Sequence, residues 1–159
     1  KTHFNKVIDR LKPLRGVDFN QGLDARLLTP HHAARIGELR MKAVRLSLDH
    51  TNEESAVMQA ISTLNEAGIP ARLLRVYALI GFKDSPDDAL YRLETLKKMG
   101  IFPNVQRYQP LDTLKKDSFV ATGWTDRQLK DYGRYWNRQV WLWKVPFTEY
   151  TSRTAGRCV

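Results

Sequence analysis

The sequence predicts an α/β fold built on a parallel β-sheet, and three observations lead to this prediction. Segments that alternate apolar and polar residues, the two-residue period of a strand, open near Val17, Ala43, Arg72 and Asn104. A helix pattern with its own start signal follows each of the first three segments. The openings recur about every thirty residues, the length of a βα unit, and such units form parallel sheets with right-handed crossovers.

The first part of the chain is expected to form a helix, a strand and a second helix. Residues 3–15 have apolar side chains at helical spacing, and Gly16 follows as a stop. Residues 17–28 alternate, which predicts a strand whose polar face carries Asp18, Asn20, Gly22, Asp24 and Arg26. Thr29 and Pro30 then supply the hydroxyl N-cap and the N1 proline of a helix that contains Ala33, Ile36 and Leu39.

The middle of the chain repeats this order. Residues 43–50 alternate as a strand, and residues 51–54 have the spacing of a capping box for a helix with an apolar stripe at Val57, Ala60, Ile61 and Leu64. Residues 72–80 predict the next strand, which Gly81 ends, and the sequence Ser85-Pro86-Asp87-Asp88 predicts the start of a helix. Residues 104–109 are expected to form a fourth, more polar strand.

The C-terminal part differs in character and is expected to be an extension, residues 113–159, to a domain that covers residues 1–112. After an irregular connection, residues 125–128 form a second capping box for a helix that carries Leu129, Tyr132, Trp136 and Val140. This helix is expected to pack on the edge of the sheet. Four tryptophans near helical spacing favour sealing of the core over base stacking, and residues 151–159 are expected to be frayed.

Composition narrows the class of protein. Of the 159 residues 42% are hydrophobic and 27% charged, and no apolar run is long enough to cross a bilayer, which predicts a folded domain without a membrane partner. The single cysteine, Cys158, can form neither a disulfide framework nor a metal site alone, which favours the cytoplasm. Lys1 begins the sequence without a signal-peptide pattern, so further residues are expected upstream.

Other site types receive less support. The net charge of +9 suits a nucleic-acid partner, but the basic residues are spread along the chain, most densely over residues 127–138 and 97–98. A metal site at His31, His32 and His50 lacks an acidic or thiol partner at ligand spacing. The chain has no phosphate loop, glycine-rich dinucleotide turn or serine-nucleophile elbow.

The predicted strands share an unusual feature, a polar face. Burying such groups unpaired costs several kcal/mol each, so they pair with one another, face solvent or hold a polar ligand. Ion pairs and a ligand explain the pattern equally well. Position favours a ligand, because Asp24, Arg26, Asp49 and Gly81 fall at the carboxyl ends of strands, where α/β barrels bind ligands. Both signs of charge are present, which suits a zwitterionic ligand.

The succession FNQGLDARLLTP, KAVRLSLDH, RVYALIGFKDSPDDALYRLETLKKMGI and NVQRYQPL resembles the later part of a radical S-adenosylmethionine (SAM) enzyme domain, over about residues 5–112. That family has a partial (β/α)6 TIM-like barrel, and the resemblance implies strands three to six. LIGF is similar to the fifth-strand glycine motif, which implies adenine contact at Ile80 and Gly81. The remaining cofactor-binding candidates implied by the resemblance or by the polar strand faces are Gln21, Asp24, Arg26, Ser47, Asp49, Arg75, Tyr77 and Arg107.

The resemblance also implies an activity and its requirements. Complete members carry a CxxxCxxC loop that ligates a [4Fe-4S] cluster, and they cleave SAM to a 5′-deoxyadenosyl radical. That loop is absent here and is expected upstream, so this chain alone is expected to be inactive. A complete enzyme would take electrons from a flavodoxin or ferredoxin, and its substrate is unknown. The alternative is a cluster-free α/β binding module that holds nucleic acid with a basic surface and an aromatic tail.

Overall fold

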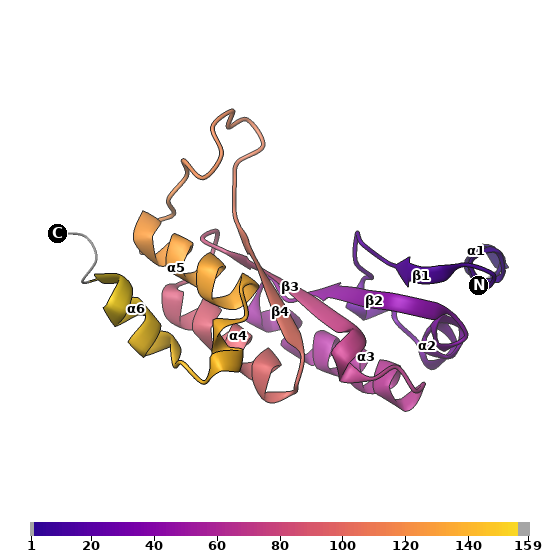
Figure 1. Ribbon diagram of the computed structural model, residues 1–159. Coiled ribbons are helices and arrows are strands. Elements are labelled where there is room, and N and C mark those ends of the chain that lie inside the picture. The colour runs from indigo at the N-terminus through magenta and orange to yellow at the C-terminus, as the bar shows by residue number, and fades with distance from the viewer. Residues whose placement is uncertain (1, 156–159) are drawn as a thin grey trace.

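A four-stranded, all-parallel sheet organises the chain, as the computed structural model shows for residues 2–155 (Figure 1). Its strands are β1 (Arg15–Asp18), β2 (Arg40–Ser47), β3 (Leu74–Ile80) and β4 (Phe102–Arg107), and they lie side by side in chain order. Each strand pairs in parallel with the next. The predicted α/β class and parallel sheet are therefore confirmed. Cys158 lies outside the described residues.

Helices connect the strands and cover one side of the sheet. The connecting helices are α2 (Pro30–Gly37), α3 (Glu54–Glu66) and α4 (Pro86–Lys98), which lie on the same side (Figure 1), and α1 (Thr2–Leu11) precedes β1. Two predicted N-caps are confirmed. The Thr29 hydroxyl accepts a hydrogen bond from the backbone N–H of His32, and Ser85 forms a capping box with Asp88.

The alternation of the central strands determines what each side of the sheet presents. In β3, Leu74, Val76, Ala78 and Ile80 are fully buried against the helices, while Arg75 and Tyr77 lie half-buried on the other face. In β2, Val44 and Leu46 are buried and Arg45 shares the face of Tyr77. The sheet therefore has one apolar face and one polar face, as predicted from the two-residue period.

Two predictions near the ends of the strands are wrong. The strand expected over residues 17–28 ends at Asp18, and a one-turn 3-10 helix, η1 (Ala25–Leu27), follows. Gly22 adopts a φ of 82°, and the Asp24 side chain accepts the backbone N–H of Arg26, so local polar bonds replace the extended conformation. The capping box expected at residues 51–54 is also absent, because His50 caps a second 3-10 helix, η2 (Thr51–Glu53).

The C-terminal part forms α5 (Asp126–Asn137), a 3-10 helix η4 (Val140–Trp143) and α6 (Phe147–Ala155). The capping box of Thr125 with Gln128 is confirmed, whereas α6 contradicts the expected fraying over residues 151–155. The rest of the segment expected to be frayed, residues 156–159, lies outside the described residues. Trp124 and Trp136 are buried and Trp141 packs against the same cluster, while Trp143 is 74% exposed. Sealing of the core, rather than base stacking, is therefore the role of most of the tryptophans.

Helix α5 lies along β4, the last strand of the sheet (Figure 1). The side-chain amide of Asn137 accepts the backbone N–H of Val105 and donates to its carbonyl, at 2.7 and 2.9 Å. An amide that satisfies both groups of an edge residue replaces the neighbouring strand that this edge lacks. Residues 108–125 connect β4 to α5 without a helix or strand, as predicted for residues 112–123. Within the described residues, no helix is long and apolar enough to span a membrane.

Candidate functional site

Two adjoining cavities lie on the polar face of the sheet, where β2 ends and beside Tyr77 in the middle of β3. The first, of about 260 Å³, lies between the β1–α2 connection, the end of β2 and the start of α3. The second, of about 450 Å³, extends from the end of β2 past Tyr77 of β3 towards Gln106 of β4. Gln21, Ser47 and Tyr77 line both cavities. We call the two cavities together the carboxyl-edge trough, because they lie at the carboxyl ends of the strands, where parallel sheets place their ligands.

The trough brings together six of the ten residues that the sequence proposes for cofactor binding. Gln21, Asp24 and Arg26 come from the β1–α2 connection, Ser47 ends β2, Asp49 follows it, and Tyr77 comes from β3. These residues are distant in sequence, and the parallel arrangement aligns the ends of their strands at one edge. Asn20, Glu53 and Gln106 also line the trough and were not among the candidates.

The four other candidates line neither cavity. Ile80 is fully buried in the core cluster that contains Trp136. Gly81 has a φ of 74°, and a Cβ there would lie 2.7 Å from Leu129 Cδ2 of α5. Glycine at this position therefore permits close packing of α5 against the end of β3. These positions place Ile80 and Gly81 among core contacts.

The two remaining arginines are also held elsewhere. Arg107 lies in β4 on the face of Ile80, its register partner, and its guanidinium donates to Asp126 Oδ1 at 2.8 Å and to the Phe119 carbonyl. Arg75 is the second residue of β3, near the amino ends of the strands, and stacks over the Phe102 ring at 4.4 Å. Neither guanidinium is directed into the trough by these contacts.

An ion pair on the polar face supports Tyr77. The Arg45 guanidinium binds Asp18 through two hydrogen bonds of 2.8 Å and donates to the Tyr77 hydroxyl at 2.9 Å. The Arg45 contact holds the pKa of Asp18 below its ordinary value, and Asp18 raises that of Arg45. The ion-pair explanation of the polar face therefore accounts for Asp18 and Arg45, and their geometry fixes the position of the tyrosine in the trough.

Other polar groups of the trough remain available to a ligand. Within the described part of the chain, the side chains of Gln21, Ser47 and Gln106 make no hydrogen bond. The Asp49 carboxylate accepts the backbone N–H of Leu79 at 2.9 Å. Partial burial raises the pKa of Asp49 and the nearby Glu53 adds to the rise, although Asp49 is an exposed residue. A carboxyl group in a cavity whose charged form is disfavoured by its surroundings is characteristic of a binding site.

Beneath the trough, a buried ion pair that the sequence analysis missed joins the strand ends. Arg92 of α4 is 1% exposed, and it donates to the carbonyls of Leu48 and Leu79 and to the Asp84 carboxylate. The other Asp84 oxygen accepts the backbone N–H groups of Gly81 and Phe82. The signal was present in the sequence, because an arginine occupies the apolar stripe of α4 beside Ala89, Leu93 and Leu96. This cluster fixes the ends of β2 and β3 relative to each other.

The three histidines considered for a metal site have other contacts. His31 Nε2 lies 3.0 Å from Asn5 Oδ1, His32 Nδ1 lies 3.1 Å from the Leu27 carbonyl, and His50 caps η2. Among residues 2–155, no group of three or more His, Cys, Asp or Glu side chains is arranged to hold a metal ion.

No family model matches the chain, and comparisons with curated proteins and with solved structures also give no match. The function is therefore argued from the residues and the geometry of the trough.

Proposed function

We propose that this chain is the SAM-binding part of a radical SAM enzyme and that the carboxyl-edge trough holds the cofactor. One observation carries the proposal: unpaired polar side chains line adjoining cavities at the carboxyl ends of a parallel sheet whose opposite face is covered by helices. We further propose that the four strands belong to a partial (β/α)6 barrel, for which the all-parallel order is a requirement.

The chemistry of the trough suits a zwitterionic nucleoside. Cavities of roughly 300–1,000 Å³ hold ligands of this size, and the two cavities here, of about 260 and 450 Å³, adjoin. Asp49 can accept hydrogen bonds from a ribose diol or an ammonium group. Ser47 and Gln21 each offer a donor and an acceptor, and Leu46 and Val57 supply an apolar wall to the first cavity. Arg26 carries a positive charge that Asp24 balances at 2.8 Å.

The iron–sulfur cluster does not fit the residues of this chain. Cluster ligation requires several cysteine thiolates, and the sequence contains one cysteine. We therefore assign no step of a reaction to these residues. Their proposed task is to bind and orient SAM and to exclude water from it, while the cluster and an electron donor such as flavodoxin or ferredoxin act from outside these 159 residues. A cytoplasmic location is part of the same proposal.

Binding of SAM to the full chain tests the proposal directly by isothermal titration calorimetry, without a cluster. Ser47→Phe fills the point where the cavities meet and is expected to weaken binding by about tenfold or more, since ~1.4 kcal/mol corresponds to a factor of ten. Ser55→Phe is the matched control, because Ser55 is an exposed residue of α3 outside both cavities. It should bind SAM like the parent chain.

The outcome separates the proposals. Binding that Ser47→Phe removes and Ser55→Phe preserves supports the cofactor site. No heat of binding at millimolar SAM, or equal loss in both variants, contradicts it. A longer form of the protein that supplies the cysteine loop then tests the activity, as 5′-deoxyadenosine released from SAM under dithionite. A cluster that forms without cleaving SAM would refute the enzyme and leave a binding domain.

A further inference from the structure

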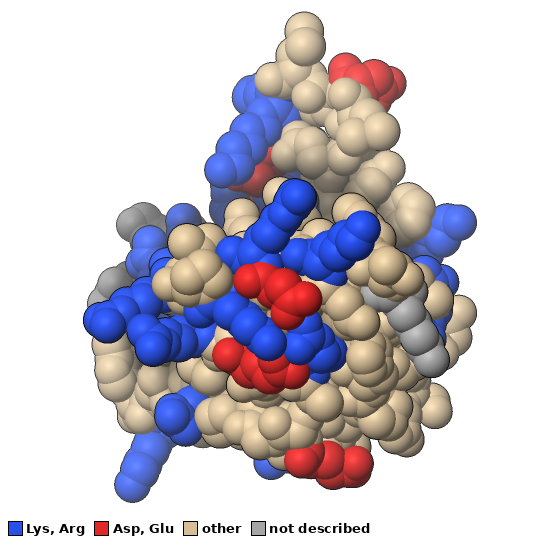
Figure 2. Space-filling view, turned by 90° about the vertical axis from the view of Figure 1, so that its right-hand side faces the viewer, with Lys and Arg blue, Asp and Glu red and all other residues tan. Residues whose placement is uncertain are grey.

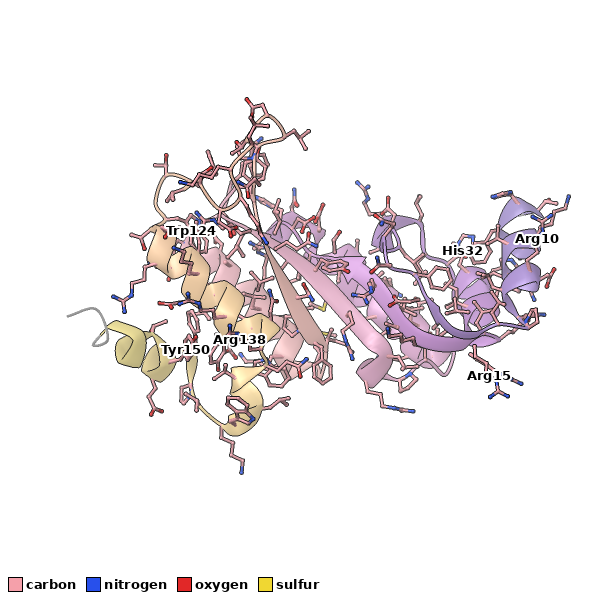
Figure 3. All side chains as sticks on the ribbon, turned by 45° about the horizontal axis from the view of Figure 1, so that its top comes forward. Arg10, Arg15, His32, Trp124, Arg138 and Tyr150 are labelled. Atoms are coloured by element: carbon pink, nitrogen blue, oxygen red, sulfur yellow. The ribbon has the colours of Figure 1, made fainter. Side chains whose placement is uncertain are left out.

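A second surface, at the amino ends of the strands, carries unpaired positive charge. It comprises Arg10 at the end of α1, Arg15 at the start of β1, Arg40 and Lys42 in the first half of β2, and Arg72 in the turn before β3. We call these five residues the amino-end basic surface. All five are exposed. Figure 2 views the molecule from this side and shows Lys and Arg side chains gathered on it, and Figure 3 shows Arg10 and Arg15 at the same end of the molecule.

Carboxylates of the same region neutralise other cations. Lys12 and Arg35 share Asp9 and Glu38 in a network of ion pairs between α1 and the end of α2. Within the described residues, the amino-end basic surface has neither an ion pair nor a side-chain hydrogen bond. The four arginines of this surface therefore face solvent without an internal ion pair, while Lys42 lies near enough to Asp18 to help lower the pKa of that carboxyl.

The strand register places some of these cations opposite one another. Arg15 and Arg40 are direct partners in β1 and β2, strands that lie about 4.8 Å apart, and like charges at such positions destabilise a sheet. The next pair of strands repeats the arrangement with Arg45 and Arg75, of which only Arg45 has a carboxylate partner. Burial and the neighbouring Arg45 lower the pKa of Arg75. An anion bound across the strands would relieve repulsion that the chain itself leaves in place.

We propose that the amino-end basic surface binds the phosphate backbone of a nucleic acid. Four of its five residues are arginine, whose planar fork matches phosphate oxygens in a bidentate manner. The cations follow the ends of adjacent strands, so they present a row of charges rather than one point. A lipid surface would require several apolar side chains to insert beside them, and Leu14 is the large exposed apolar residue adjoining this row. The inference is independent of SAM binding, because the trough lies at the other ends of the strands.

The amino-end basic surface does not include residues 127–138, where basic residues are densest in the sequence. In α5, Arg127 pairs with Asp131 at 3.6 Å, and Lys130 pairs with Asp126 at 2.7 Å. Part of the densest basic segment is thus neutralised within its own helix. The spread-out cations of the amino-end basic surface become a cluster only when the sheet forms.

The test compares two triple variants of the full chain with the same change in net charge. Arg15→Gln, Arg40→Gln and Arg72→Gln alter the amino-end basic surface, whereas Lys116→Gln, Arg134→Gln and Arg138→Gln alter exposed cations elsewhere. Arg138 lies at the end of the molecule away from Arg10 and Arg15 (Figure 3). Fluorescence anisotropy with labelled single-stranded RNA and duplex DNA of ~20 units measures affinity between about 50 and 200 mM salt, without SAM.

The first triple variant is expected to bind nucleic acid at least tenfold more weakly than the parent chain. For duplex DNA, the slope of log K against log salt concentration should be less negative by about two to three. The control should remain within about twofold of the parent. Equal losses in both variants, or no binding by the parent at low salt, would overturn the proposal. Binding to vesicles of phosphatidylserine and phosphatidylcholine with none to either nucleic acid would also overturn it, in favour of a lipid surface. Circular dichroism confirms that each variant is folded.

Discussion

Replacing Arg92 with methionine should destabilise the protein more than most single substitutions. Methionine retains much of the side-chain length and apolar stem, so the change removes the guanidinium while creating little empty space. It leaves the carbonyls of Leu48 and Leu79 without their buried donor, and it leaves the Asp84 carboxylate, 6% exposed, without its cation. The effect therefore comes from uncompensated polar groups and not from a cavity.

The magnitude follows from the state of Asp84. Breaking a buried ion pair by removing one partner costs about 3–5 kcal/mol, because the remaining charge is left in a poorly solvated site. Asp84 keeps two backbone N–H donors, those of Gly81 and Phe82, which places the expected loss near the lower end of that range. A loss of about 3 kcal/mol is a large fraction of the 5–15 kcal/mol that typically stabilises a domain.

Urea unfolding followed by far-UV circular dichroism at neutral pH measures this loss. Arg138→Met is the matched control, because Arg138 is exposed at the end of α5, and it should change the free energy of unfolding by less than about 0.5 kcal/mol. Asp84→Asn and the double variant complete a double-mutant cycle, in which the two losses should not add. A loss below about 1 kcal/mol for Arg92→Met would refute the assignment of Arg92 as the group that holds the strand ends together.

Three further predictions concern the trough and its supports. Asp49→Asn should raise the free energy of unfolding at neutral pH by a few tenths of a kcal/mol in urea titrations, because burial raises the pKa of this carboxyl. This gain in stability should vanish as pH falls towards the ordinary pKa of 3.8. Calorimetry should show that the same variant binds SAM more weakly. Asp18→Asn should cost about 1 kcal/mol at neutral pH, because Arg45 lowers the pKa of Asp18; in a pH series of urea titrations this cost should be constant well above pH 3.8, shrink progressively as pH falls below 3.8, and be gone once pH reaches the lower folded-state pKa. Gly81→Ala should cost about 1–3 kcal/mol in thermal or urea unfolding, since its Cβ would meet Leu129, and adding Leu129→Ala should cost less than the two single changes together.

Local signals predicted the parts of the fold that depend on neighbours in sequence. The alternation in residues 72–80 fixed which side of β3 is apolar, and Ser85, Pro86 and Asp88 marked the start of α4, because a cap and its partner lie within one helical turn. The same reasoning failed over residues 17–28. Alternation there is real, but Asp24 binds the backbone N–H of Arg26 and closes a turn, and a pattern of polarity cannot reveal which of the two hydrogen-bonding arrangements forms.

The site was predictable only as far as strand order determines it. Ser47 and Tyr77 meet in the trough because they occupy matched positions in neighbouring parallel strands. Gly81 and Arg107 were assigned by their place at strand ends, yet their surroundings are set by α5 and the connection before it, which contact them across long sequence separations. Arg92 likewise reaches the carbonyl of Leu48, 44 residues away. Contacts of this kind depend on how helices dock, and residue periodicity contains little information about docking.

The two ends of the sheet differ in whether their charged side chains are balanced by opposite charges. This difference is consistent with the two separate binding roles that we propose for them. At the carboxyl ends, Asp24 balances Arg26 and a carboxylate, Asp49, stands beside uncharged polar groups, so a polyanion would meet little net attraction there. At the amino ends, Arg15 is paired in register with Arg40 and not with an acidic residue. A row of phosphates would therefore be attracted to this end more strongly than a small zwitterion. Parallel strands alone make this division possible, since they gather all their first residues at one edge and all their last residues at the other.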